Sequence, residues 1–183
     1  MLGGIHMLGD HMLCDIHNFK NTADYLSILN GALITDIFFV MLLYFGAFTS
    51  KYLQNWYRDL SLSAVIADTL IIVIGIIIAR FLYPYIFTKY SLLKFIVLAL
   101  GIQITHDILF YLLCVSVPRG KSRILDIFKD YGKEVGSGAI VADSLMMISA
   151  ILVASYLKGF SLNANIITLI VTVYLVPYAI YTV

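Results

Sequence analysis

Charged residues are scarce in this chain: they occupy 13% of its 183 positions, whereas 61% of the positions are hydrophobic. Soluble domains carry about 25% charged and about 45–50% apolar residues, so too few polar side chains are present here to cover a soluble globule. The mean hydropathy of +0.95 agrees with this conclusion. With only 12 glycines and 3 prolines, the chain is neither collagen-like nor a disordered low-complexity protein. The composition therefore predicts a polytopic membrane protein.

Several other features are missing. The two cysteines, Cys14 and Cys114, are far apart, so no disulfide framework is expected. The formal net charge is only +1, which gives no basic surface for nucleic acid. The sequence contains no Asn-x-Ser/Thr acceptor and no Walker A, GxGxxG, HExxH or GxSxG motif. We expect a non-enzymatic protein that needs no cofactor and binds no nucleic acid.

Long apolar stretches dominate what is present. A bilayer core of about 30 Å needs about 20 residues of helix, and five stretches meet or nearly meet that length. Arg80 lies near the end of the second stretch and is expected to extend to the headgroups as a boundary anchor. The fold class is therefore all-α, an integral membrane bundle of five transmembrane helices. The predicted spans are Leu26–Phe48, Leu62–Tyr83, Leu92–Val117, Gly138–Leu157 and Ile166–Val183.

An internal duplication organises these spans. The block Asp36–Phe39 resembles Asp107–Phe110, and Ala64–Leu70 resembles Ala139–Leu145, with Tyr57 aligned to Phe128 between them. Each unit reads as span, amphipathic helix, span, so the two units enter the membrane in the same direction and are parallel repeats. The predicted organisation is an N-terminal tail (1–24) and a transmembrane domain (25–183), with repeats at about 25–90 and 91–160 and an extra span at 164–183.

The segments that join the two spans of each unit, Ser50–Leu60 and Arg119–Gly136, have apolar residues at helical spacing and charged residues between them. They carry slightly more Lys and Arg than the opposite side, which favours a cytoplasmic position. Two interpretations are open: a helix that docks on a membrane surface or partner, and a simple structural elbow. The candidate interfacial residues are Leu53, Trp56, Tyr57, Ile124, Phe128 and Tyr131.

Four aspartates interrupt the apolar spans, and a charged side chain in the bilayer centre costs at least about 2.5–3.5 kcal/mol, so they should face the bundle interior. Counted from the span ends, all four lie at a similar depth, nearer the amphipathic helices. Three interpretations are open: a proton or cation relay, hydrogen bonds that hold helices together, and a metal site. This predicted polar layer consists of Asp36, Asp68, Asp107, Asp143 and His106.

The N-terminus contains three short related pieces, MLGGIH, MLGDH and MLCDIH. Imidazole and thiolate groups are ligands that zinc and copper accept. The pieces are therefore either a metal-binding tract or a loosely ordered tail. The candidate ligands are His6, His11, Cys14 and His17.

The block LSAVIADTLIIVIGIIIARFLYP, from Leu62 to Pro84, is similar to multispan membrane proteins of large nucleocytoplasmic DNA viruses. That resemblance implies a place in a virion membrane or in a host intracellular membrane, with viral structural proteins as partners. We expect a multi-pass protein with a structural or organising role, in contact with the lipid bilayer and with copies of itself. The alternative is a small proton or cation channel or transporter that uses the buried aspartate layer.

Overall fold

The computed structural model describes residues 13–47 and 49–181, and these residues form helices and connecting segments only. Within these described residues, five helices are long and apolar enough to cross a membrane. The fold-class prediction is confirmed, and the chain is a polytopic membrane protein. The long helices are α1 (Asp24–Tyr44), α3 (Leu62–Ile86), α4 (Leu92–Ser116), α6 (Gly138–Leu157) and α7 (Leu162–Ile180), and the short ones are α2 (Lys51–Leu60) and α5 (Arg123–Val135).

Serine caps set several of the helix starts. The hydroxyl of Ser50 accepts the Leu53 N–H at 3.1 Å, so α2 begins one residue after Ser50. Ser122 starts α5 in the same way. Ser161 does so for α7, which begins four residues earlier than predicted because this cap precedes the apolar run. The predicted end of the first span was too late, since α1 ends at Tyr44.

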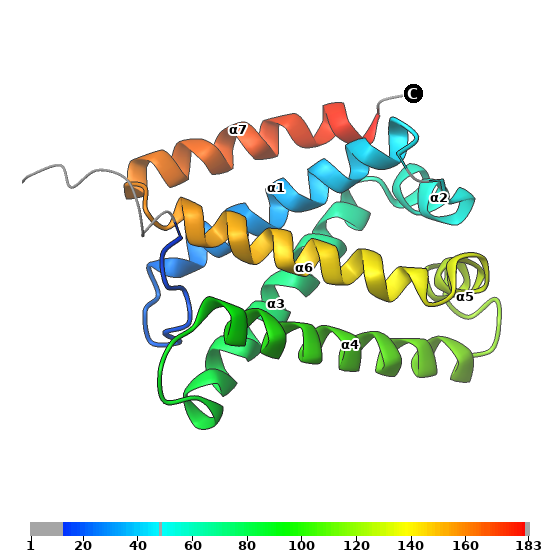
Figure 1. The fold of residues 1–183 in the computed structure, drawn as a ribbon. Coiled ribbons are helices and arrows are strands. Elements are labelled where there is room, and N and C mark those ends of the chain that lie inside the picture. Colours follow the sequence, from blue (N-terminus) through cyan, green and yellow to red (C-terminus); the bar gives the residue numbers. More distant parts are fainter. Residues whose placement is uncertain (1–12, 48, 182–183) are drawn as a thin grey trace, which may run out of the picture.

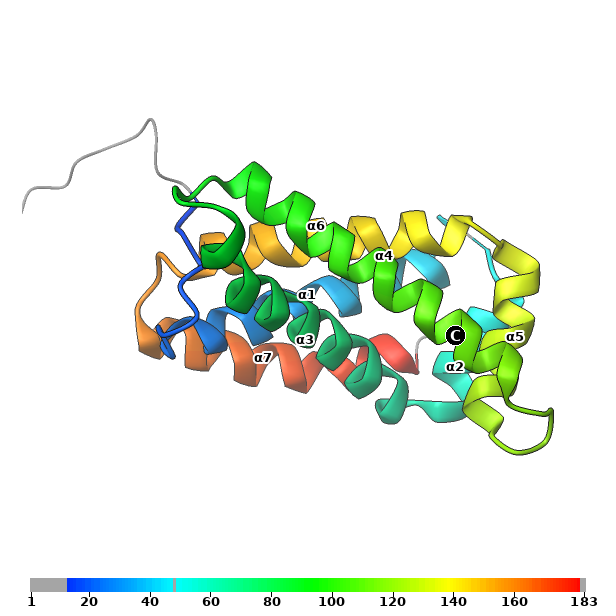
Figure 2. The same cartoon turned by 90° about the horizontal axis from the view of Figure 1, so that it is seen from below.

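Four of the long helices form one bundle, in which α1 and α4 each contact both α3 and α6, and α7 packs against α1 (Figure 1). The order long helix, short helix, long helix occurs twice and is followed by α7. This is the order that the duplication predicts. The short helices α2 and α5 contact each other and lie at the same end of the bundle (Figure 2).

The contact between α1 and α6 is unusually close because small residues meet there. A Cβ atom added to Gly31 would lie 2.7 Å from the Ala150 carbonyl oxygen and 2.9 Å from the Ala154 Cβ. Small residues allow two helix backbones to approach in this way inside a membrane. Gly31 and the two alanines therefore fix the position of α6 against α1.

Part of the predicted tail is ordered against the bundle. Ile16 is fully buried, and the Cys14 N–H donates to the Ser155 carbonyl of α6 at 2.9 Å. The His17 ring stacks on Tyr90, with 4.8 Å between the ring centroids. The expectation of a loosely ordered tail is thus wrong for residues 13–17, because these residues pack against the ends of the spans opposite α2 and α5.

The same segment changes the role of Arg80. Instead of reaching the headgroups, Arg80 is 0% exposed. Its guanidinium donates to the backbone carbonyls of Asn18 and Asn21 and lies 3.2 Å from the Asp24 carboxylate, which also binds Lys158 at 2.9 Å. The expectation that Arg80 is a boundary anchor at the headgroups is therefore wrong. Arg80 joins α3 to the N-terminal segment, whose backbone carbonyls accept its hydrogen bonds.

Candidate functional site

The predicted aspartate layer opens onto a cavity of about 340 Å³ between α3, α4 and α6. Each of these three helices contributes one carboxylate: Asp68 from α3, Asp107 from α4 and Asp143 from α6. His106 also lines the cavity. Asp36, on α1, does not line the cavity and is fully buried. The structure therefore brings three of the four aspartates to one space and places the fourth next to it.

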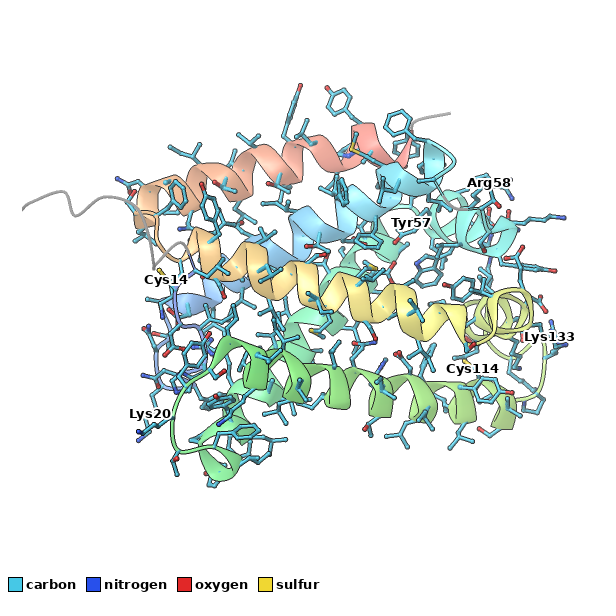
Figure 3. The ribbon with its side chains drawn as sticks, viewed as in Figure 1. Cys14, Lys20, Tyr57, Arg58, Cys114 and Lys133 are labelled. Atoms are coloured by element: carbon cyan, nitrogen blue, oxygen red, sulfur yellow. The ribbon has the colours of Figure 1, made fainter. Side chains whose placement is uncertain are left out.

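All six candidate interfacial residues line the same cavity. Leu53, Trp56 and Tyr57 come from α2, and Trp56 and Tyr57 are only 3% and 4% exposed. Figure 3 shows Tyr57 directed toward the bundle and its neighbour Arg58 directed outward. The three residues from α5, on the other side of the cavity mouth, are Ile124, Phe128 and Tyr131. The apolar faces of both short helices thus cover the cavity.

The carboxylates of the first unit are held by side chains of α2 and α3. The Tyr57 hydroxyl lies 2.7 Å from Asp68 Oδ2 and 3.2 Å from Asp36 Oδ1. Trp56 Nε1 donates to the same Asp68 oxygen at 2.9 Å, and Thr69 Oγ1 donates to Asp36 Oδ2 at 3.2 Å. A phenol has one proton, so both Tyr57 contacts form together only when a carboxyl group holds a second one.

Burial raises the pKa of Tyr57, and the adjacent carboxylates of Asp68 and Asp36 raise it further. The phenol therefore stays protonated at neutral pH and remains a donor to the two acids. It links α1, α2 and α3 through one atom, which connects the covering helix directly to the intramembrane layer.

The second unit leaves its carboxylates open. Asp107 Oδ1 accepts from Gln103 Nε2 at 2.6 Å and lies 3.3 Å from His106 Nδ1. Its other oxygen, Oδ2, is buried without a hydrogen-bond partner. The Asp143 carboxylate has neither a hydrogen bond nor an ion pair with any residue that the structure describes. A buried acceptor without a donor is costly, so Asp107 Oδ2 is suited to bind something that supplies donors or positive charge. The Asp143 carboxylate is half-buried and lines the same cavity.

The difference between the units has a simple origin in the sequence. Tyr57 of the first unit has Phe128 as its predicted counterpart, and Trp56 has Ile127. Phe128 and Ile127 lack the hydroxyl and the indole N–H with which Tyr57 and Trp56 bind Asp68 in the first unit. The first unit thus holds its acid pair by hydrogen bonds, whereas in the second unit Asp107 Oδ2 and the Asp143 carboxylate lack donors among the described residues.

Hydrogen bonds and an ion pair join α2 to α5 and hold the two helices together over the cavity. Glu134, at the end of α5, accepts from the Ser50 hydroxyl and from the Lys51 N–H at 3.1 Å at the start of α2. At the other end of the pair, Arg123 lies 3.0 Å from Asp59. The Ser50 hydroxyl and the backbone N–H groups hold the pKa of Glu134 below its usual range. The ion pair of Arg123 with Asp59 is at the surface, where such contacts are weak, whereas Ser50 is buried beneath Glu134.

The structure bears only partly on the proposed metal ligands. His6 and His11 lie outside the described residues. Cys14 and His17 pack against the bundle separately, and His17 Nδ1 is 2.5 Å from Asp15 Oδ1. Among residues 13–47 and 49–181, no three His, Cys, Asp or Glu side chains form a group that could hold a metal ion.

Two contributors to the site were missed in the sequence. Phe110 lies one turn after Asp107 on α4, and its helical spacing could have placed it on the same wall. Glu134 stands in the charged part of α5, and no local pattern points to its partner Ser50, 84 residues away.

The similarity of Leu62–Pro84 to viral membrane proteins stays a prediction, and so do the duplication and the oligomeric state. Comparison of the chain with protein-family models, with curated proteins and with solved structures found no match.

Proposed function

We propose that this protein binds a cation in the acidic cavity and moves it across the membrane, as a small carrier or channel. One observation supports the proposal above all others: carboxylates from three different spans, Asp68, Asp107 and Asp143, face one cavity. Ionisable groups inside a membrane are expensive, and facing a shared polar space is typical of ion and proton pathways. This function was the alternative in the sequence analysis, and the open carboxylates of the second unit are what favour it.

Movement of the covering helices would widen access to the cavity, which is already partly open. The cavity lies under α2 and α5, and their surface ties are the Glu134 contacts with α2 and the pair of Asp59 with Arg123. Opening would break these contacts and, on α2, the Trp56 and Tyr57 hydrogen bonds to Asp68 as well. The opening and closing of α2 and α5 would control entry from the side on which these helices lie.

Flux measurements on the full chain in liposomes test the proposal. Proton, potassium and labelled methylammonium movement are measured for the wild type, Asp143→Asn and Asp107→Asn. The matched control is Asp126→Asn, which changes the same group on α5 at a half-buried position that does not line the cavity. We expect each cavity variant to reduce the transported cation's flux at least tenfold and the control to leave it unchanged. A wild type that moves none of the three cations would refute the proposal.

A structural or organising role in a viral membrane is the second candidate. The first unit supports it, because Tyr57 joins Asp36 and Asp68 and so holds three helices together. In this case the outward residues of the short helices, such as Arg58 and Lys133 (Figure 3), would meet viral structural proteins. Absence of flux, together with cross-links from these two positions to a defined capsid or scaffold protein, would favour this role.

A further inference from the structure

Six of the eighteen residues that line the acidic cavity are Phe, Tyr or Trp. Phe128 is central: its ring centroid lies 4.7 Å from that of Trp56 and 5.0 Å from that of Phe110. Tyr131 also lines the cavity, and burial and the nearby Asp143 carboxylate raise the pKa of its hydroxyl. Ring faces carry negative electrostatic potential and attract cations that have shed their water. An aromatic wall facing carboxylates therefore suits a cation that also has an apolar body.

The available acceptors point to a ligand with N–H donors. Asp68 Oδ2 is already occupied by Trp56 and Tyr57. The free acceptors are Asp107 Oδ2 and the Asp143 carboxylate, which come from adjacent helices α4 and α6. An ammonium group has several donors and one positive charge, so it can satisfy both acids in charge-assisted hydrogen bonds.

The size of the cavity fits this class of ligand. Its volume of about 340 Å³ is at the lower end of the range of about 300–1,000 Å³ for small-molecule pockets. One water occupies only about 30 Å³ in the liquid. A dehydrated inorganic ion would leave most of the cavity empty and would make no contact with the aromatic side chains. A small amine with a ring or short alkyl chain would fill it.

We propose that the cavity binds a small organic ammonium ion, with its nitrogen at Asp107 and Asp143 and its apolar body against Trp56, Phe110 and Phe128. This inference rests on the proposed function, since it names the class of cation that occupies the same site. It assigns different tasks to the two units: the first holds the covering helix in place, and the second binds the charge.

The chain carries its own probe for this site. Trp56 is the only tryptophan in the sequence, and it lines the cavity. Its fluorescence therefore reports occupancy without labelling. The full chain in lipid nanodiscs is titrated with benzylammonium chloride, with potassium chloride and with benzyl alcohol, at constant ionic strength. Benzyl alcohol controls for size and apolar character because it has no charge.

We expect a saturable emission change with benzylammonium only, and at least a tenfold weaker affinity in Asp143→Asn and Asp107→Asn. Asp126→Asn, outside the cavity, should bind as the wild type does. An equal response to benzyl alcohol, or unchanged affinity in both cavity variants, would overturn the inference. Carboxylate-dependent proton or potassium flux without a benzylammonium response would overturn the ligand class and leave cation transport standing. Absence of both binding and flux would overturn the two proposals together.

Discussion

The hydroxyl of Tyr57 offers the most direct test of how α2 is attached to the membrane spans. Tyr57→Phe removes one oxygen atom and leaves the ring in place. It deletes the 3.2 Å contact with Asp36 Oδ1 and the 2.7 Å bond to Asp68 Oδ2. Asp68 Oδ2 keeps the Trp56 donor, whereas Asp36 Oδ1 is left buried with no donor.

The expected magnitude follows from that single orphaned oxygen. Leaving a buried acceptor unsatisfied costs about 1–3 kcal/mol. Hydrogen bonds between membrane helices average only about 0.6 kcal/mol, which sets the lower limit. We therefore expect Tyr57→Phe to lower the free energy of unfolding by about 0.6–3 kcal/mol.

Equilibrium unfolding in mixed micelles, followed by circular dichroism, measures this change. Tyr52→Phe is the matched control: it makes the same substitution on the same helix, and the Tyr52 hydroxyl makes no hydrogen bond with any described residue. The control should stay within about 0.5 kcal/mol of the wild type. Equal unfolding midpoints for the two variants would show that Tyr57 does not hold α2 to the intramembrane acids.

Three further predictions use the same unfolding assay. Gly31→Ala should destabilise by about 1–3 kcal/mol, because the new Cβ meets the α6 backbone at 2.7 Å; Gly101→Ala, with nothing within 4 Å, should not, and equal effects would contradict the close contact. Glu134→Gln should destabilise at pH 7. Because the folded state holds the pKa of Glu134 below its ordinary value of 4.5, the difference from wild type should vanish as the pH falls below that value, and a difference that persists in acid would refute the tie. Arg80→Met should cost about 1–3 kcal/mol, because it removes the donor to the Asn18 and Asn21 carbonyls and leaves Asp24 paired with Lys158 alone, and an unchanged midpoint would argue against these contacts.

Much of the candidate site could be predicted from the sequence. Aspartates in apolar spans must face away from lipid, and counting residues from the span ends placed Asp36, Asp68, Asp107 and Asp143 at one depth. The contrast between the units was also visible, because Tyr57 aligns with Phe128. These inferences need only the rise per residue of an α-helix and the free-energy cost of placing a charged side chain in the bilayer core.

Other parts depend on contacts between distant segments. Arg80 is buried because residues 13–23 fold over it and turn their carbonyls toward its guanidinium. The sequence pattern around Arg80 does not predict that an N-terminal segment packs over it. The tie between Glu134 and Ser50 likewise joins residues 84 positions apart.

The number of spans, the two short amphipathic helices and the depth of the acids were set locally, since each depends on apolar length and helical spacing along one segment. Only the tertiary structure decided that the short helices cover a cavity, and that Asp36 is enclosed while Asp143 stays open. The reason is physical: hydropathy acts residue by residue, whereas the pairing of a donor with an acid requires helices from both units to be packed together.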